Sequence, residues 1–248
     1  MLKLFKKIAQ RHFPIIGFYI HRILKCEFEI FPPRFIFIIN KKLHKWVKRE
    51  FTGNSGFFVE IGANNGLSQS NTAYLEKYCG WKGILVEAIP HKFIECKHNR
   101  NKSDVYHAAA VPFNFNEEYI KLKYCSCMSI MDDSSLTKYL NIKEHIESGA
   151  KDLGVDEDIA GMTFFAPTIT MDKIFQRHNY PKIDFFSLDV EGYELEVLMG
   201  IDFSKIDIDV FLIEARNVSV VEEYLAKHEY YLDDKITHHD YVFRKKKK

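Results

Sequence analysis

From Phe57 to the end of the chain, short apolar runs alternate with helical patterns, and this alternation is what most constrains the fold. Runs typical of buried strands lie at 57–61, 83–88, 103–111, 183–190 and 209–215. Helical patterns lie at 68–80, 90–100, 171–178, 194–200 and 219–228. Strand–helix alternation of this kind predicts an α/β fold, with a parallel sheet covered by helices on both faces.

Three further segments complete this outline. Residues 118–124 alternate polar and apolar side chains as an edge strand would, and 230–245 read as a closing hairpin, which predicts one antiparallel strand near the sheet's edge. Residues 125–165 lose the strand–helix rhythm. We expect this stretch to be an inserted loop with one short helix, a candidate lid over a site.

The first 50 residues differ in composition from the rest of the chain. They contain 12 Lys and Arg against 3 Asp and Glu, together with many aromatic residues. We therefore predict a basic, helical extension at 1–50 and one domain at 51–245. Neither short apolar run among residues 1–40 approaches the roughly 20 apolar residues of a spanning helix. Two interpretations stay open: contact with an anionic membrane surface, or packing of the extension on the domain.

The five cysteines are odd in number, and Cys125 and Cys127 have no second pair with which to form a zinc site. This pattern favours a reduced compartment, so we expect a cytoplasmic protein, at most peripheral to a membrane.

The first predicted strand runs into a loop with two glycines, Gly62 and Gly66. Glycines here permit a tight turn and close approach of the backbone to a ligand. The loop lacks the G-x-G-x-x-G pattern of dinucleotide binding. Its spacing E-x-G-x-x-x-G, beginning at Glu60, matches the nucleoside-binding loop of methyltransferases that use S-adenosylmethionine. Glu87 ends the second strand, where a carboxylate can accept hydrogen bonds from both hydroxyls of a ribose.

Residues 185–200, FFSLDVEGYELEVLMG, carry the most specific pattern. With TITMDKIF before them, they resemble the signature of the FkbM-type methyltransferase family. The segments VEAIP (86–90) and FLIEA (211–215) fall where that family has its other characteristic blocks. The resemblance covers about residues 55–245.

The resemblance implies a class I methyltransferase fold, with seven strands in the order 3-2-1-4-5-7-6 and the last strand reversed. It implies S-adenosylmethionine as the cofactor and O-methylation of a hydroxyl on a sugar, glycan or glycolipid. The candidate cofactor-binding residues are Glu60, Gly62, Asn64, Asn65, Gly66, Glu87, Ala88, Ala109 and Asp189. Two features depart from the family pattern: the loop is polar at Asn64 and Asn65, and residues 125–165 match little.

An alcohol is a poor nucleophile, so we expect a base to take its proton during transfer. Asp189, Glu191 and Glu214 lie at adjacent strand ends and are the catalytic candidates. His238 and His239 are weaker ones. A magnesium ion held by Asp189, Glu214 and Asn217 is an alternative way to acidify the acceptor.

Two other functional classes stay open. The chain could be a non-catalytic protein of the same fold that serves in binding or trafficking at a membrane. The basic ends also suggest nucleic acid as a substrate. The acidic middle of the chain and the missing N-P-P-Y motif argue against that interpretation.

Overall fold

The computed structural model describes residues 41–51, 53, 55–124, 130–131 and 162–246. Its helices are α3 (Lys41–Glu50), α4 (Ala73–Tyr78), α5 (Pro90–Asn99), α7 (Met171–Arg177), α8 (Glu194–Leu198) and α9 (Val218–Ala226). The larger sheet consists of β1 (Phe57–Ile61), β2 (Lys82–Glu87), β3 (Asp104–His107), β8 (Phe185–Leu188), β9 (Val210–Glu214), β10 (Tyr230–Lys235) and β11 (Asp240–Lys245).

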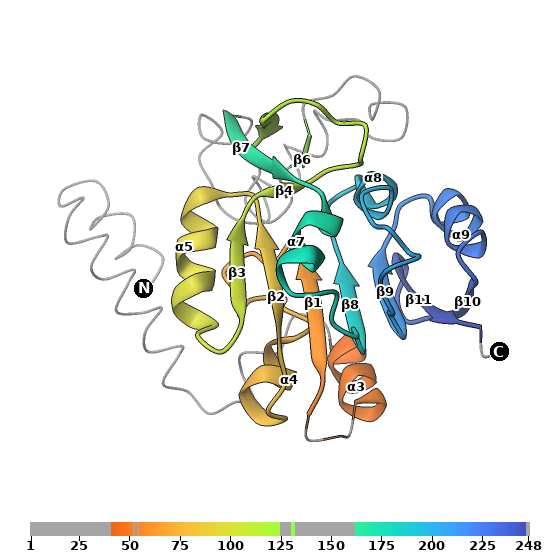
Figure 1. The fold of residues 1–248 in the computed structure, drawn as a ribbon. Helices are drawn as coiled ribbons and strands as arrows, with labels where there is room; N and C mark the ends of the chain where they lie inside the picture. Colours follow the sequence, from red (N-terminus) through yellow and green to blue (C-terminus); the bar gives the residue numbers. More distant parts are fainter. Residues whose placement is uncertain (1–40, 52, 54, 125–129, 132–161, 247–248) are drawn as a thin grey trace, which may run out of the picture. The chain divides into compact units, whose positions relative to one another are not determined.

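The seven strands of this sheet lie in the order β3-β2-β1-β8-β9-β11-β10 (Figure 1). Strands β3, β2, β1, β8 and β9 pair in parallel, and β11 pairs antiparallel with both β9 and β10. Numbered along the sheet, this is the order 3-2-1-4-5-7-6 with the last strand reversed. The predicted class I methyltransferase fold is confirmed, and the carboxyl ends of β1, β2 and β8 meet at one edge.

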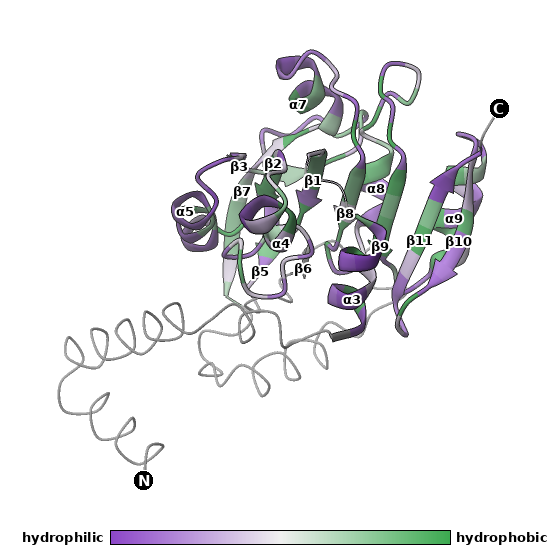
Figure 2. Cartoon of the chain, turned by 90° about the horizontal axis from the view of Figure 1, so that it is seen from below, coloured by the Kyte–Doolittle hydropathy of each residue, from purple (hydrophilic) through white to green (hydrophobic). Residues whose placement is uncertain are grey.

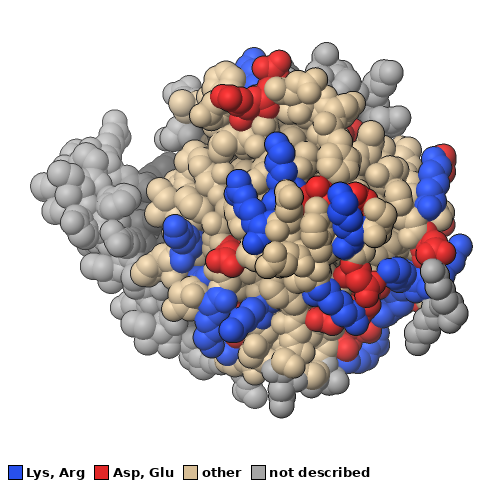
Figure 3. All heavy atoms as spheres, in the orientation of Figure 1, with Lys and Arg blue, Asp and Glu red and all other residues tan. Residues whose placement is uncertain are grey.

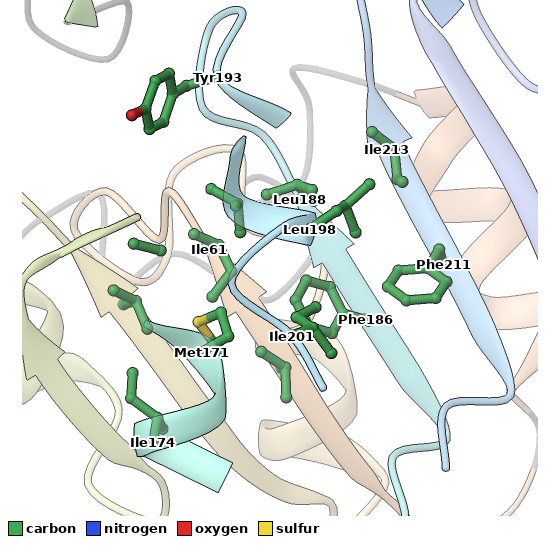
Figure 4. Packing of buried hydrophobic residues seen from close by; sticks show 14 of the residues in the cluster. Ile61, Met171, Ile174, Phe186, Leu188, Tyr193, Leu198, Ile201, Phe211 and Ile213 are labelled. Atoms are coloured by element: carbon green, nitrogen blue, oxygen red, sulfur yellow. The ribbon is translucent and has the colours of Figure 1, made fainter. Parts of the chain in front are cut away.

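Successive side chains of each strand point to opposite faces of the sheet, and this divides the core into two layers. Val59, Ile84 and Phe186 belong to one buried cluster, while their neighbours Phe58 and Leu85 belong to the other. Helices α7, α8 and α9 cover the first layer, and α3, α4 and α5 cover the second. Figure 4 shows Met171 and Ile174 of α7 and Leu198 of α8 packed with strand residues of the first layer. In Figure 2 the helices are coloured purple along much of their length, as expected for helices that cover a core.

The prediction of a single strand over 103–111 was wrong. The chain leaves the large sheet after His107, and Ala109–Ala110 form a separate strand, β4. β4 pairs with β7 (Thr163–Ile169), which also pairs with β5 (Tyr119–Lys123), and β5 in turn pairs with β6 (Ile130–Met131). Ala108 still donates its N–H to the Glu87 carbonyl of β2, whereas Ala109 and Ala110 pair with Thr168 and Ile169 of β7, so the chain crosses between the sheets at this point.

The interpretation of 125–165 as one irregular insert was wrong at its end, because residues 163–165 belong to β7. The strand at 118–124 exists, but it lies between β6 and β7 in the small sheet. The rest of the predicted insert, 125–129 and 132–161, lies outside the described residues, as does the predicted short helix.

Helix α3 packs on the sheet. Its Leu43, Trp46 and Val47 are buried in the second core layer, and the Trp46 ring lies 6.1 Å from that of Phe185. Residues 1–40, predicted as part of a helical extension, lie outside the described residues, so that part of the prediction stays a prediction. Among the described residues, no helix has the length and apolar character needed to cross a bilayer.

Candidate active site

A cavity opens where the carboxyl ends of β1, β2 and β8 meet. It is lined by Ile61, Gly62, Ala63, Asn64, Ser68, Gln69, Ser70, Val86, Glu87, Ala88, Ile89, Ala108, Ala109, Ala110, Leu122, Phe164, Asp189, Val190, Glu191, Tyr193 and Val197. The large sheet and its loops supply most of this lining, and Leu122 and Phe164 of the small sheet supply the rest. This is where a ligand is expected in an open parallel sheet.

The loop after β1 is fixed by a close approach to the loop after β8. Gly62 has a φ of +81°, and a Cβ at this position would lie 1.8 Å from the carbonyl oxygen of Asp189. Only glycine fits there. Asn64 also has a positive φ, +49°, which asparagine tolerates better than most residues. The two loops therefore run side by side along the cavity.

Glu87, at the end of β2, is buried with its carboxylate held by backbone. The Asn64 N–H donates to Oε2 (2.7 Å), and the Ile89 N–H donates to Oε1 (2.7 Å). Burial raises the pKa of Glu87, and these backbone hydrogen bonds oppose the rise. Each carboxylate oxygen has a second lone pair, so Glu87 can still accept hydrogen bonds from a ligand in the cavity.

Glu60, in β1, faces away from the cavity into a buried ionic network. Its carboxylate accepts hydrogen bonds from Ser70 Oγ (2.8 Å), the Asn71 N–H (2.8 Å) and Thr72 Oγ1 (2.6 Å). The Arg100 guanidinium, fully buried, lies 3.4 Å from Glu60 and 3.0 Å from Glu76. We call Arg100, Glu60 and Glu76 with their hydroxyl partners Ser70 and Thr72 the Arg100 network.

This network explains why the predicted helix at 68–80 is shorter, α4 beginning only at Ala73. Residues 70–72 turn toward Glu60 rather than continue a helix backward. The Arg100 guanidinium also donates to the Gly66 carbonyl (3.0 Å), and a Cβ on Gly66 would lie 2.6 Å from Arg100 Cγ. The network thus supports the glycine loop from behind.

A second group of carboxylates lies at the ends of β8 and β9 and the start of β11. Asp189, Glu214 and Asp240 follow one another across the strands, since Leu188 pairs with Ile213 and Glu214 pairs with Asp240. With Glu191 and Glu194 we call this set the acidic cluster. Burial, and then the charges of Glu214, Glu191 and Glu194, raise the pKa of Asp189 well above its usual range.

Within the acidic cluster, Asp189 and Glu214 lie next to each other at the ends of neighbouring strands, and the other carboxylates around each of them disfavour its charged form. Burial, and then the charges of Glu191 and Asp240, raise the pKa of Glu214 to about 7. Asp240 is buried and accepts a hydrogen bond from the Thr237 hydroxyl. Of the five carboxylates, only Glu191 forms an ion pair with a described cation, Arg216 (3.0 Å).

The loop between β8 and α8 owes its shape to Glu194. Glu191 and Gly192 have φ angles of +55° and +105°, and the Gly192 N–H donates to Glu194 Oε1 (2.7 Å). Glu194 is buried, which raises its pKa to about 7. Its carboxyl group closes the turn that presents Glu191 to the cavity.

The cavity brings together six of the predicted site residues: Gly62, Asn64, Glu87, Ala88, Ala109 and Asp189, and with them the catalytic candidate Glu191. Glu60, Asn65, Gly66 and Glu214 do not line it. Asn65 instead accepts hydrogen bonds at Oδ1 from the Leu67 and Ser68 N–H groups (3.0 and 2.8 Å). A direct contact of these four residues with the cofactor or substrate stays a prediction.

Sequence reasoning missed several lining residues, among them Gln69, Leu122, Phe164 and Tyr193. Alternation in EYIKLKY marks Ile120 and Leu122 as one face of a strand, but no local signal says that this face covers the cavity. His238 and His239, the weaker base candidates, are exposed and do not line it. In the part of the chain that the structure describes, no group of three or more His, Cys, Asp or Glu side chains is arranged to hold a metal ion.

The model of the methyltransferase FkbM domain matches residues 60–243, most of the chain. The chain belongs to the FkbM methyltransferase family.

Solved structures with a similar fold include an FkbM methyltransferase from Methylobacillus flagellatus KT (14% identity, TM-score 0.44, covering 77% of this chain and 44% of that one). Another is TrmK from M. capricolum in complex with S-adenosyl-homocysteine (12% identity, TM-score 0.42, covering 84% of this chain and 67% of that one). A search of curated proteins gives no match.

FkbM methyltransferases use S-adenosylmethionine, which is the cofactor of this chain. The cavity has the donor and acceptor chemistry for it. Glu87 keeps carboxylate lone pairs for ribose hydroxyls, Gly62 keeps the loop open where a Cβ would collide, and Ala108, Ala109 and Ala110 leave room for a flat ring.

Proposed function

We propose that this FkbM methyltransferase O-methylates a hydroxyl group of a sugar, glycan or glycolipid, with the Asp189 carboxylate as general base. The observation that carries the proposal is the position of Asp189: it lines the same cavity as Gly62 and Glu87, and its neighbours are carboxylates. S-adenosylmethionine, when bound, supplies an electrophilic methyl group. The chain has to orient the hydroxyl, exclude water and remove one proton.

Asp189 is better suited to this proton transfer than the other two catalytic candidates. A carboxylate whose pKa is raised toward neutrality is a stronger base for a hydroxyl than an ordinary aspartate. Glu191 lines the cavity as well, but its carboxylate is held by Arg216 at 3.0 Å. Glu214 does not line the cavity and acts through its charge, which raises the pKa of Asp189.

The other lining residues fit a hydroxyl acceptor. Ser68, Gln69 and Ser70 are polar and uncharged, while Leu122, Phe164 and Val197 are apolar. Such a mixture can hydrogen-bond hydroxyls and pack against the apolar face of a sugar ring or a lipid-linked group. In this proposal Glu87 holds the ribose of the cofactor with Ala88 beside it, the loop from Gly62 to Asn64 borders the methionine part, and Ala109 borders the adenine.

The proposal is tested by incubating the protein with isotopically labelled S-adenosylmethionine and a panel of free sugars, glycans, glycolipids and transfer RNA. We expect label on a hydroxyl oxygen of a sugar-containing acceptor, identified by mass spectrometry, and loss of that product in Asp189→Asn. Label on a base nitrogen of RNA would contradict the proposed acceptor class. The alternative of a non-catalytic protein predicts no transfer to any member of the panel.

Membrane contact through the basic N-terminal extension at 1–50, and a location at the membrane surface, stay predictions. Of this extension the structure describes only α3, Lys41–Glu50.

A further inference from the structure

The exposed side of helix α3 is cationic. Its side chains Lys42, Lys45, Lys48 and Arg49 are exposed, whereas Leu43, Trp46 and Val47 are buried against the sheet. The apolar side of this amphipathic helix is therefore already used by the core, and what remains for solvent or a partner is positive charge.

This arrangement of charges is unfavourable for the helix by itself. Lys42 and Lys45 are three residues apart and Lys45 and Arg49 four apart, spacings at which like charges repel across a helix surface. Lys42 also lies in the first turn, where the helix dipole disfavours a cation. Among the described residues, no carboxylate forms an ion pair with any of the four cations. An anion outside the chain would relieve this repulsion.

Helix α4 extends the cationic surface and adds aromatic side chains to it. Lys48 Nζ lies 4.7 Å from the centre of the Tyr74 ring, and the rings of Tyr74 and Tyr78 are 5.5 Å apart. Lys77 and Tyr78 are exposed. We call Lys42, Lys45, Lys48, Arg49, Tyr74, Lys77 and Tyr78 the α3–α4 face.

The carboxylates of these two helices do not neutralise the face. Glu50 of α3 is ion-paired with Arg244 (2.7 Å), and Glu76 of α4 is buried against Arg100 (3.0 Å). Figure 3 shows cations and anions interspersed over much of the surface that it views. Ion pairs such as Lys205–Asp202 (2.7 Å) and Lys182–Asp209 (2.9 Å) are found elsewhere on the surface. The α3–α4 face, by contrast, has an excess of positive charge.

We propose that the α3–α4 face binds the surface of an anionic phospholipid bilayer. Lysine side chains can extend into the headgroup layer while tyrosine rings lie at the boundary of the apolar region. Each cation held near an anionic bilayer contributes to binding without requiring a fixed pattern of partners. This inference does not depend on the identity of the methyl acceptor.

The position and charge of the cavity argue against nucleic acid as the partner of this face. Helix α4 ends at Tyr78, just before β2 begins at Lys82, so the end of the face lies at the amino ends of the strands, away from the cavity. The cavity itself is lined by the carboxylates of Glu87, Asp189 and Glu191. A polyanion bound to the face would be repelled where it would have to enter the site.

The test is co-sedimentation of the full chain with vesicles of phosphatidylcholine, with and without phosphatidylserine. We expect wild type to bind only the vesicles that contain phosphatidylserine, and added salt to weaken that binding. The double variant Lys42→Gln with Lys45→Gln should partition at least tenfold more weakly. The matched control, Lys102→Gln with Lys173→Gln, removes two exposed cations elsewhere and should stay within threefold of wild type.

A second double variant, Lys42→Glu with Lys45→Glu, separates binding from folding. Glutamate in the first turn suits the helix dipole, so this protein should melt at the wild-type temperature or higher and yet lose vesicle binding. Absence of wild-type binding to anionic vesicles overturns the proposal. An equal loss in the control pair overturns it as well, and so does unchanged binding of the α3 variants. If these variants lose binding to duplex RNA but keep binding to vesicles, the face is assigned to nucleic acid.

Discussion

Two groups of acidic side chains in the molecule differ in what balances their charge. In the Arg100 network, a fully buried guanidinium lies 3.4 Å from Glu60 and 3.0 Å from Glu76. In the acidic cluster, only Glu191 has a described cation as an ion-pair partner, and carboxylate faces carboxylate. Balanced charge holds a loop in place, whereas unbalanced charge raises the pKa of a carboxyl group, as is common at functional sites.

The difference also follows from which side of each loop the side chains occupy. The Arg100 network lies behind the glycine loop and binds its backbone, through the Gly66 carbonyl and the Asn71 N–H. Asp189 and Glu191 lie in front of it, in the cavity lining. An acidic residue at a strand end is therefore not by itself evidence of a catalytic role. The groups that pair with its carboxylate decide whether such a residue is a catalytic candidate or a structural one.

The largest effect is expected for Asp189→Asn in the acidic cluster. Asparagine has nearly the same shape but cannot accept the proton, so methyl transfer should fall by about 10²–10⁴-fold. Removal of a charge that its neighbours repel should leave stability equal or higher. The measurements are the initial rate of labelled methyl transfer and the free energy of unfolding in urea. Exposed Glu222→Gln is the control and should leave both unchanged.

In the Arg100 network, Arg100→Met should mainly affect folding. Methionine fills similar volume but leaves the carboxylates of Glu60 and Glu76 buried without their cation, at a cost of about 3–5 kcal/mol in the free energy of unfolding. Urea titration measures the loss. The exposed arginine variant Arg177→Met is the matched control and should change stability by less than about 0.5 kcal/mol. If the two variants change the free energy of unfolding equally, Arg100 does not stabilise the fold by neutralising these carboxylates.

Glu87 belongs to neither the Arg100 network nor the acidic cluster, so Glu87→Ala tests cofactor binding independently of both. Loss of a carboxylate that accepts hydrogen bonds from ligand hydroxyls should weaken binding of S-adenosylmethionine about 10–100-fold, measured by calorimetry. Glu87→Gln keeps one acceptor oxygen and should lose less. Unchanged affinity in Glu87→Ala would remove the ribose assignment and leave the role of Asp189 untouched.

The smallest predicted effect concerns pH. The pKa of Glu214 is raised to about 7 in the folded protein, from an ordinary value near 4.5. The folded state therefore binds more protons than the unfolded state between these values, so stability falls as pH rises through this window. We expect wild type to lose about 1 kcal/mol more than Glu214→Gln between pH 5 and pH 8, after allowance for solvent screening.

Urea titrations at several pH values check this expectation. The raised pKa of Asp189 predicts that methyl transfer rises with pH, because the base must be deprotonated to act. A wild-type stability profile parallel to that of Glu214→Gln would contradict the raised pKa of Glu214.

The larger sheet was predictable because each of its strands carries its own local signal. FFVEI and FLIEA are apolar at nearly every position, as strands covered on both faces must be, and the helices between them fix the parallel order. Gly62, Glu87 and Asp189 were predictable for the same reason: each follows directly on such a strand. The predictions that were wrong concern the places where the chain leaves this pattern, at Ala108 to Ala110 and at β7.

The roles of the acidic residues could not be read from the sequence, because they depend on partners far along the chain. Glu60 and Arg100 are 40 positions apart, and nothing near Arg100 marks it as buried. Glu194 accepts a hydrogen bond from the Gly192 N–H (2.7 Å), and this contact places its carboxyl group in the turn. Tertiary contacts, absent from any local pattern, separate the carboxylates paired with Arg100 from those that lie among other carboxylates.

The most direct test of the difference between the Arg100 network and the acidic cluster compares Glu60→Gln with Asp189→Asn in one set of measurements. For each variant, the turnover per folded molecule and the free energy of unfolding are determined together, with the acceptor found by the labelled panel. We predict that Glu60→Gln loses about 2 kcal/mol of stability, since a buried charged partner of Arg100 is removed, with turnover within severalfold of wild type. Asp189→Asn should show the opposite: wild-type stability and at least a hundredfold slower transfer. The reverse pattern, with Glu60 needed for turnover and Asp189 only for folding, would contradict the account.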